Sequence, residues 1–156
     1  ADWVSGASMM VRRQVFEQIG LMDEGYFLYY EETDFCRRAR QAGWEVWYEP
    51  AARVMHIAGQ STGVTGRQSV VPRRPAYWFE SRRRYFVKHH GRLYAAVADL
   101  AWMLGFSIWR VRRRLQRKND TDPPRMLVDF VAHSVLCHPR WTPKVDAGAD
   151  VVRVNR

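Results

Sequence analysis

The stretch YFLYYEETDFCRR at residues 26–38 decides how the first part of this chain folds. It places three carboxylates, Glu31, Glu32 and Asp34, directly behind a run of aromatic side chains and directly before a helical pattern. Acidic side chains are favoured at the positive end of a helix dipole, so a purely structural role is open. Carboxylates gathered behind so much apolar surface are also typical of a set held for chemistry.

Spacing separates the roles of these carboxylates. Glu31 and Asp34 are three residues apart and share one flank of the helix, and Asp34 can pair with Arg38 one turn later. Glu32 lies four residues before Cys36, over the apolar side, where desolvation would raise its pKa toward that of a useful general base. Structural ion pairs produce similar clusters, so spacing alone leaves both catalysis and structure open.

Helices and strands are predicted to alternate around this stretch. Apolar residues at helical spacing predict a short helix after Arg12 that ends at Gly20, and a second helix from about Glu32 to Gly43. Between them, residues 21–30 contain the turn-forming sequence Asp-Glu-Gly and predict a loop. Residues 44–49 and 52–57 alternate as strands on either side of Pro50, which predicts an α/β fold.

A boundary is predicted at residues 64–75, a mobile loop rich in Gly, Ser, Arg and Pro. Residues 76–90 then form a basic, aromatic helix capped by Gly91. Residues 93–109 contain a single charge, Asp99, and an arginine cluster follows them. We favour an interfacial helix there, ahead of a buried core helix and then a membrane span. A last helix is expected over 126–136, started by Asp122 and Pro123.

Composition and charge divide the chain into unlike parts. The 156 residues are 47% hydrophobic, enough for a folded core and inconsistent with intrinsic disorder. Residues 1–62 carry six Arg and nine acidic residues, net −3, whereas residues 63–156 carry 19 Lys or Arg and seven acidic residues, net +12.

Two distant cysteines form no zinc or disulfide pattern and fit a reducing compartment. The first residue is Ala1 and no signal-peptide pattern follows, so we expect a longer parent protein.

Two further kinds of residue have alternative interpretations. His56 ends the second predicted strand, and strand ends are where ligands gather in α/β sheets, although a lone histidine is more often structural. With carboxylates from elsewhere it could bind a divalent ion. Trp3, Trp44 and Trp47 could offer flat faces to a sugar ring, but core packing is the expected role of at least two of them.

Several of these motifs together resemble a known family. They are DWVSGASM at residues 2–9, Arg12-Arg13 before a helix with Phe16, FLYYEETDFCR at 27–37 with Gly43, and VMH at 54–56 followed by Gly59 and Ser61. Their order and spacing, over about residues 1–63, resemble the carboxyl-terminal half of family 2 glycosyltransferases, nearest to the rhamnosyltransferase-like enzymes of bacterial surface polysaccharide synthesis. WFESRRRYF at 78–86 more loosely resembles the membrane-associating region of the same enzymes.

The resemblance implies a fold and a reaction. The fold would be the acceptor-side half of a GT-A (Rossmann-like) α/β domain over residues 1–63, with amphipathic helices over 76–156 as a membrane-associating region. The reaction would be inverting transfer of a sugar from a nucleotide diphosphate-sugar. The pair Glu31-Glu32 stands where the family has Glu-Asp, so Glu32 takes the position of the base, and the assistance of Glu31 or Asp34 stays open.

The resemblance also implies binding residues and a cofactor. Ser5, Gly6 and Ala7 match the segment beside the donor sugar, and His56 matches the histidine near the metal and the donor diphosphate. The donor- and acceptor-binding set is completed by Trp3, Gln60 and Ser61. The cofactor would be Mg²⁺ or Mn²⁺, with the family's Asp-x-Asp ligands expected upstream of residue 1. This chain alone would therefore bind nucleotide poorly and would not turn over.

The expected partners follow from the same reading. They are a nucleotide-sugar donor, a lipid-linked saccharide acceptor and an anionic membrane surface, with no nucleic acid. The expected location is the cytoplasmic face of the bacterial inner membrane, held peripherally or inserted shallowly. Two rival classes are a basic nucleic-acid-binding module, favoured by a pI near 10.1, and a non-catalytic assembly domain.

Overall fold

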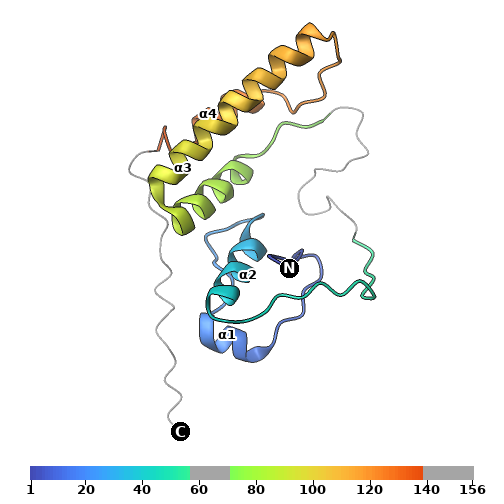
Figure 1. The fold of residues 1–156 in the computed structure, drawn as a ribbon, viewed down its shortest axis with the longest axis vertical. Helices are drawn as coiled ribbons and strands as arrows, with labels where there is room; N and C mark the ends of the chain where they lie inside the picture. Colours follow the sequence, from blue (N-terminus) through green and yellow to red (C-terminus); the bar gives the residue numbers. More distant parts are fainter. Residues whose placement is uncertain (57–70, 139–156) are drawn as a thin grey trace. The chain divides into compact units, whose positions relative to one another are not determined.

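The computed structural model describes residues 1–56 and 71–138, which belong to two compact units (Figure 1). We call residues 1–56 the first unit and residues 71–138 the second unit. Most of the predicted loop at 64–75, and the predicted site residues Gln60 and Ser61, lie outside the described residues.

The first unit contains two helices, α1 (Arg13–Ile19) and α2 (Glu31–Gln41). Both end where glycine predicts an end, because Gly20 (φ 77°) and Gly43 (φ 89°) adopt the left-handed region that other residues avoid. The amide of Gly20 donates to the Phe16 carbonyl at 2.9 Å and closes α1. The predicted helices are thus confirmed.

A small core joins the two helices. Val15 of α1 packs with Phe35 and Ala39 of α2, and all three side chains are buried. The rings of Phe16 and Phe35 lie 5.2 Å apart. Three residues on the two flanking segments cover this core, namely Met9, Val11 and Trp44.

The predicted strands at 44–49 and 52–57 are not found, since residues 1–56 and 71–138 contain no strand. Burial does alternate from Ala42 to Trp47, as expected of an extended chain. A strand needs a neighbouring strand to take up its backbone hydrogen bonds, and here the Ala1 amino group, at 2.7 Å from the Val46 carbonyl, supplies a single contact. The family expectation of an α/β domain is therefore not confirmed by the described residues.

The second unit is a helical hairpin with a third segment packed on it. Its main helix, α3 (Ala76–Leu115), is interrupted at Gly91, where φ is 77° and ψ is 172°. The chain reverses there, so that residues 76–90 and 92–115 lie alongside each other (Figure 1). The predicted glycine cap after His90 is confirmed.

One buried carboxylate, Asp99, ties three segments of the second unit together. It forms an ion pair with Arg82 in the first half of α3, and it accepts a hydrogen bond at 2.9 Å from the amide of Val135, which follows α4. Its side chain is almost wholly buried. The single charge that interrupts the apolar run 93–109 is therefore a satisfied internal group.

Helix α4 (Met126–His133) packs against α3. The ring of Phe130 stacks on Trp102 with centroids 3.8 Å apart, and Asp129 accepts two hydrogen bonds from Arg73, each 2.7 Å long. The predicted start of this helix at Asp122 and Pro123 is wrong. Its N-cap is Arg125, with φ 58°, because Asp122 pairs instead with arginines of α3.

None of the helices in the described ranges combines the length and the apolar character that crossing a membrane requires.

Replacing Gly91 with Ala should lower the free energy of unfolding of the second unit by about 1–3 kcal/mol, since its backbone conformation strongly disfavours a side chain. No atom lies within 4 Å of the added Cβ, so backbone strain is the expected cause. Gly105, in the same helix and equally open, is the matched control, and Gly105→Ala should be neutral or stabilise by up to about 1 kcal/mol. Urea unfolding of the complete protein measures both, and equal effects would contradict the assignment.

Candidate active site

A tight turn at residues 23–26 comes before the aromatic run 26–30, which leads into α2. Asp23 accepts a hydrogen bond from the Gly25 amide at 2.9 Å, and its carbonyl accepts one from the Tyr26 amide at 3.1 Å. This confirms the turn predicted at Asp23-Glu24-Gly25. The buried side chain of Tyr26 then reaches back to α2, where its hydroxyl donates to Asp34 at 3.3 Å.

Two strained residues start the helix. Tyr29 (φ 67°) and Tyr30 (φ 70°) are both in the left-handed region, which costs a non-glycine residue about 1 kcal/mol or more. Tyr30 is the N-cap of α2, and its carbonyl accepts the Asp34 amide at 2.8 Å. Such strain gathers at functional sites. The left-handed backbone of Tyr29 and Tyr30 turns the chain, and α2 then begins with Glu31 and Glu32.

Asp34 has the structural role that spacing predicts. It is fully buried, and its Oδ2 atom lies 2.8 Å from Nε of Arg38. The same guanidinium donates to the carbonyls of Ile19 at 2.7 Å and Leu21 at 2.8 Å. Arg38 therefore fastens α2 to the chain that leaves α1.

Glu32 has a different environment from Asp34. Burial raises the pKa of Glu32 above its usual value, hydrogen bonds from its own amide and from Thr33 oppose that rise, and the negative charge of Glu31 adds to it. Gly6 lies against this side chain, because a Cβ on Gly6 would meet the Glu32 Cβ at 3.5 Å and its Oε2 at 4.0 Å. The predicted base and the predicted donor-side segment are thus neighbours.

Glu31 offers a second carboxylate beside Glu32. Its Oε2 atom is buried and has no hydrogen-bond partner within the described residues. A buried acceptor without a donor is costly for a fold, so this oxygen would be stabilised by any donor that reached it. In the donor-side segment, the Ser5 hydroxyl accepts a 3.3 Å hydrogen bond from the Ala7 amide.

The tryptophans do not behave as expected. Trp44 packs against the core, and its indole donates to Gln18 at 2.7 Å. Trp3 and Trp47 are 52% and 77% exposed, so the expectation that at least two of the three pack in the core is wrong. The indole of Trp47 instead donates a 3.1 Å hydrogen bond to the neighbouring Glu45.

No complete metal site is found in residues 1–56 and 71–138, where no three possible His, Cys, Asp or Glu ligands gather. The side chain of His56 is exposed. The described residues therefore do not by themselves fit the divalent cation that the family resemblance implies. His56 as a metal ligand stays a prediction.

An Asp-x-Asp sequence does occur, at Asp120-Thr121-Asp122, and sequence reasoning overlooked it. Its carboxylates pair with arginines of α3, since Asp120 lies 2.6 Å from Arg110 and Asp122 lies 3.4 Å from the same side chain. A hydrogen bond from the Asp122 amide and the nearby arginines lower the pKa of Asp120. This motif lies in the turn after α3, and its carboxylates form ion pairs with Arg110 and Arg113.

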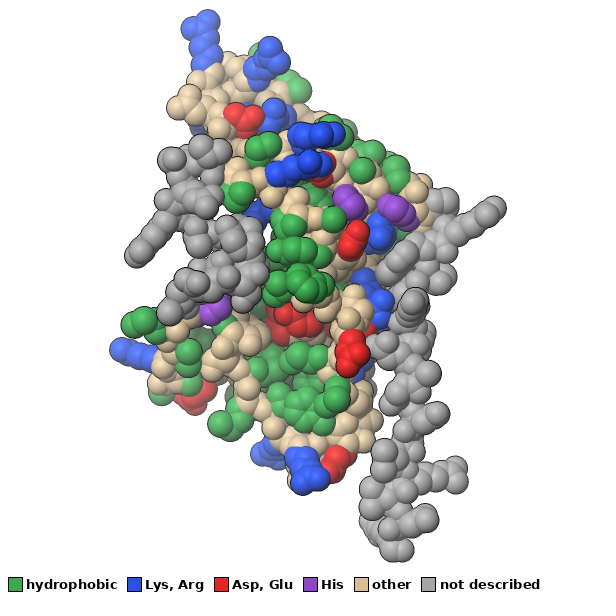
Figure 2. Space-filling model, turned by 180° about the vertical axis from the view of Figure 1, so that it is seen from behind, with side chains coloured by type: hydrophobic (Ala, Val, Ile, Leu, Met, Phe, Trp, Pro, Cys, Tyr) green, Lys and Arg blue, Asp and Glu red, His purple; other side chains and the backbone are tan. Residues whose placement is uncertain are grey.

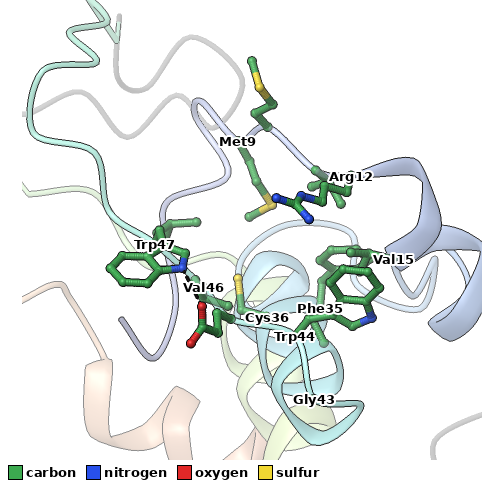
Figure 3. A pocket seen from close by; sticks show the side chains of 14 residues that line it. Met9, Arg12, Val15, Phe35, Cys36, Gly43, Trp44, Val46 and Trp47 are labelled. Atoms are coloured by element: carbon green, nitrogen blue, oxygen red, sulfur yellow. Dashed lines mark hydrogen bonds between the residues drawn. The ribbon is translucent and has the colours of Figure 1, made fainter.

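Sequence reasoning also missed a pocket of about 470 Å³ in the first unit. Figure 3 shows Trp47 on one side of it, Phe35 and Trp44 on the other, and Cys36 between them. Cys36 lies one turn after Glu32, so the pocket is on the same side of α2 as the candidate base. The alternation of apolar Trp44 and Val46 around charged Glu45 was the signal in the sequence that could have indicated it.

Comparison with known proteins assigns the family. The profile described as "Glycosyltransferase like family 2" matches residues 1–93. The chain belongs to this family. The match covers the whole first unit and extends through residues 76–90 of α3, further than the motifs of the first 63 residues indicate.

Relatives in bacteria and archaea add detail. N-acetylglucosaminyl-diphospho-decaprenol L-rhamnosyltransferase of Mycobacterium tuberculosis is 35% identical over 115 residues, which is 72% of this chain and 32% of that protein. Rhamnosyltransferase WbbL of Escherichia coli is 40% identical over 57 residues, 36% of this chain and 22% of that protein. Low-salt glycan biosynthesis hexosyltransferase Agl10 of Haloferax volcanii is 52% identical over 40 residues, 26% of this chain and 13% of that protein.

The chain thus spans at most about a third of the length of these relatives. No solved structure matches it.

Replacing Arg38 with Met should lower the free energy of unfolding by about 3–5 kcal/mol, because it leaves the fully buried Asp34 without its cation. The chain provides a matched control, since Arg13 and Glu17 form another pair four residues apart, with side chains 90% and 61% exposed. Arg13→Met should change stability by less than about 0.5 kcal/mol. Urea unfolding measures both, and a small effect of Arg38→Met would contradict the structural role of Asp34.

Proposed function

We propose that this chain is the acceptor-side part of an inverting glycosyltransferase that builds cell-surface polysaccharide, with Glu32 as the catalytic base. The observation that carries the proposal is the environment of Glu32 in a chain of glycosyltransferase family 2. Its carboxylate is partly buried, its pKa is raised, and Gly6 lies against it. A base in this condition retains enough basicity to take a proton from a hydroxyl group.

In the proposed reaction, a carboxylate oxygen of Glu32 takes the proton of the acceptor hydroxyl. The acceptor oxygen attacks the anomeric carbon of the donor sugar from the side opposite the leaving group. The bond from that carbon to the diphosphate breaks, and the nucleoside diphosphate leaves with the electron pair. The new glycosidic bond has the inverted configuration, and the proton remains on Glu32 until it passes to solvent.

Glu31 is proposed to orient the acceptor. Its buried Oε2 atom has no hydrogen-bond partner in the described residues, so a rotation of the side chain that exposes this oxygen would let it accept a hydrogen bond from a second sugar hydroxyl. Its charge also raises the pKa of Glu32. We do not propose Asp34 for either task, because its side chain is fully buried and its two oxygens already contact Arg38 and Tyr26.

For the substrates, we propose a nucleotide-linked L-rhamnose as donor and a sugar on a polyprenyl diphosphate as acceptor. Support comes from the Mycobacterium relative, whose name gives this sugar and this class of lipid-linked acceptor. The proposal includes a Mg²⁺ or Mn²⁺ ion near the donor diphosphate, with His56 from this chain and the other ligands outside the described residues. Trp3, Gln60 and Ser61 are proposed to contact the sugars.

The nucleic-acid-binding alternative has less support from the second unit. Several of its arginines are partnered within the fold, which reduces the charge available to phosphates. Arg73 pairs with Asp129, Arg82 with Asp99, and Arg110 with Asp120.

Replacing Glu32 with Gln in the complete protein should lower kcat by roughly 10²–10⁴-fold, because the amide cannot take the acceptor proton. Binding of the nucleotide-sugar should stay within about threefold of wild type, a small change on the scale of binding energies. Rhamnose transfer to a polyprenyl diphosphate-linked acceptor gives the rate, and calorimetry with the donor gives the affinity. The control is Glu24→Gln, which changes an exposed carboxylate of the preceding turn and should retain full activity. Retained transfer by Glu32→Gln would reject the assignment.

The pH profile of kcat/KM gives an independent test. A base acts when deprotonated, so kcat/KM should rise with pH through an apparent pKa above that of an ordinary glutamate. Removing the charge of Glu31 with Glu31→Gln eases deprotonation of Glu32, so this rise should move to lower pH. Glu24→Gln should leave the profile in place. A rise that stays unmoved in Glu31→Gln would show that another group titrates.

A further inference from the structure

The second half of α3 carries a continuous apolar stripe that faces outward. Its seven residues recur every three or four positions and so lie on one side of the helix. Each is between 54% and 81% exposed. They are Leu93, Val97, Leu100, Leu104, Ile108, Val111 and Leu115. At 1.5 Å per residue the stripe is about 33 Å long.

The opposite side of the same helix is the one that holds the fold together. Ala95 and Asp99 are buried there, and Trp102 stacks on Phe130 of α4. This packing fixes how the helix is rotated, so the apolar stripe cannot turn inward without breaking the Asp99 contacts. Because Asp99 is the only charged residue in 93–109 and is turned inward, the outward side of that segment has no charged side chain.

Positive charge lies at one end of the stripe. Arg112 and Arg114 are exposed and flank Val111 and Leu115 on either side of the helix. The neighbouring Arg110 and Arg113 are used within the fold, by pairing with Asp120 and Asp122. Lys and Arg side chains gather at the end of the second unit that carries the last turns of α3 (Figure 2).

Aromatic side chains stand beside the stripe near its two ends. Tyr94, at the first turn, is 53% exposed, and Trp109, near the arginines, is 38% exposed. Tyrosine and tryptophan are favoured at the boundary between lipid headgroups and hydrocarbon, where one part of the ring is apolar and the other is wet.

We propose that the stripe of residues 93–115 is a docking surface for an anionic membrane, on which this helix lies flat. The apolar side chains enter the headgroup boundary, and Arg112 and Arg114 contact anionic lipid headgroups while their stems cover the adjoining surface. A second copy of the chain fits less well. The charged residues nearest the two ends of the stripe, Arg92, Arg112 and Arg114, have one sign, whereas paired helices use flanking charges of both signs along their length.

This surface goes beyond the proposed reaction, because it requires neither a particular sugar nor turnover. Its test is flotation of the complete protein with vesicles of phosphatidylcholine containing phosphatidylglycerol. Leu100→Gln/Leu104→Gln should lower the bound fraction at least about tenfold, because two apolar side chains leave the lipid. Val128→Gln/Val131→Gln is the matched control. It changes two exposed apolar residues of α4 that are not in the stripe, and should bind as wild type does.

Charge is tested separately. Arg112→Ala/Arg114→Ala should weaken binding to the anionic vesicles severalfold and should leave binding to pure phosphatidylcholine unchanged. Binding of the wild type to anionic vesicles should fall as salt rises. Rhamnose transfer to a short-chain, water-soluble acceptor should be retained in Leu100→Gln/Leu104→Gln and in Arg112→Ala/Arg114→Ala. This measurement separates failure of the membrane surface from failure of the proposed reaction.

Three results would overturn the proposal. The first is unchanged flotation of Leu100→Gln/Leu104→Gln. The second is a change from dimer to monomer in light scattering with vesicle binding retained, which would assign the stripe to a second copy. The third is a large loss of thermal stability in the stripe variant but not in the α4 control, which would show that another part of the complete protein covers these residues.

Discussion

The ion pair between Asp34 and Arg38 is the contact on which the first unit depends. Arg38 holds a fully buried carboxylate and two backbone carbonyls at the end of α1, and Tyr26 binds the same carboxylate from the loop. The first turn of α2 is thereby fixed from both sides. One acidic residue of the cluster is used in structure, which leaves Glu31 and Glu32 of the same first turn for the proposed chemistry.

The second unit also contains a buried aspartate that forms an ion pair with an arginine. Asp99 joins Arg82 to the amide of Val135 and so fixes the rotation of the second half of α3. In the sequence, Asp99 is the one charged residue that interrupts the apolar run 93–109. In the folded unit it directs the opposite, uncharged side of the helix outward. The proposed membrane surface is a consequence of that internal contact.

The sequence predicted the features that depend on local chemistry. Glycines predicted the ends of both helices of the first unit, and the four-residue spacing of Asp34 and Arg38 predicted the ion pair between them. Features that depend on distant partners were not predicted. The segment at 44–49 has strand-like alternation but lacks a neighbouring strand in the described residues, and α4 starts late because Asp122 is taken by arginines of α3. The left-handed Tyr29 and Tyr30 had no signal, since aromatic residues rarely adopt that conformation.

Of the three neighbouring carboxylates, Glu32 is the one that we propose takes the proton of the acceptor. The most direct test is an experimental structure of the complete protein with a nucleoside diphosphate and a saccharide acceptor bound. A carboxylate oxygen of Glu32 should lie within about 2.6–3.2 Å of the attacking hydroxyl, with Asp34 still paired with Arg38. An acceptor hydroxyl bound by another carboxylate, with Glu32 turned away from it, would contradict the assignment of Glu32 as the base.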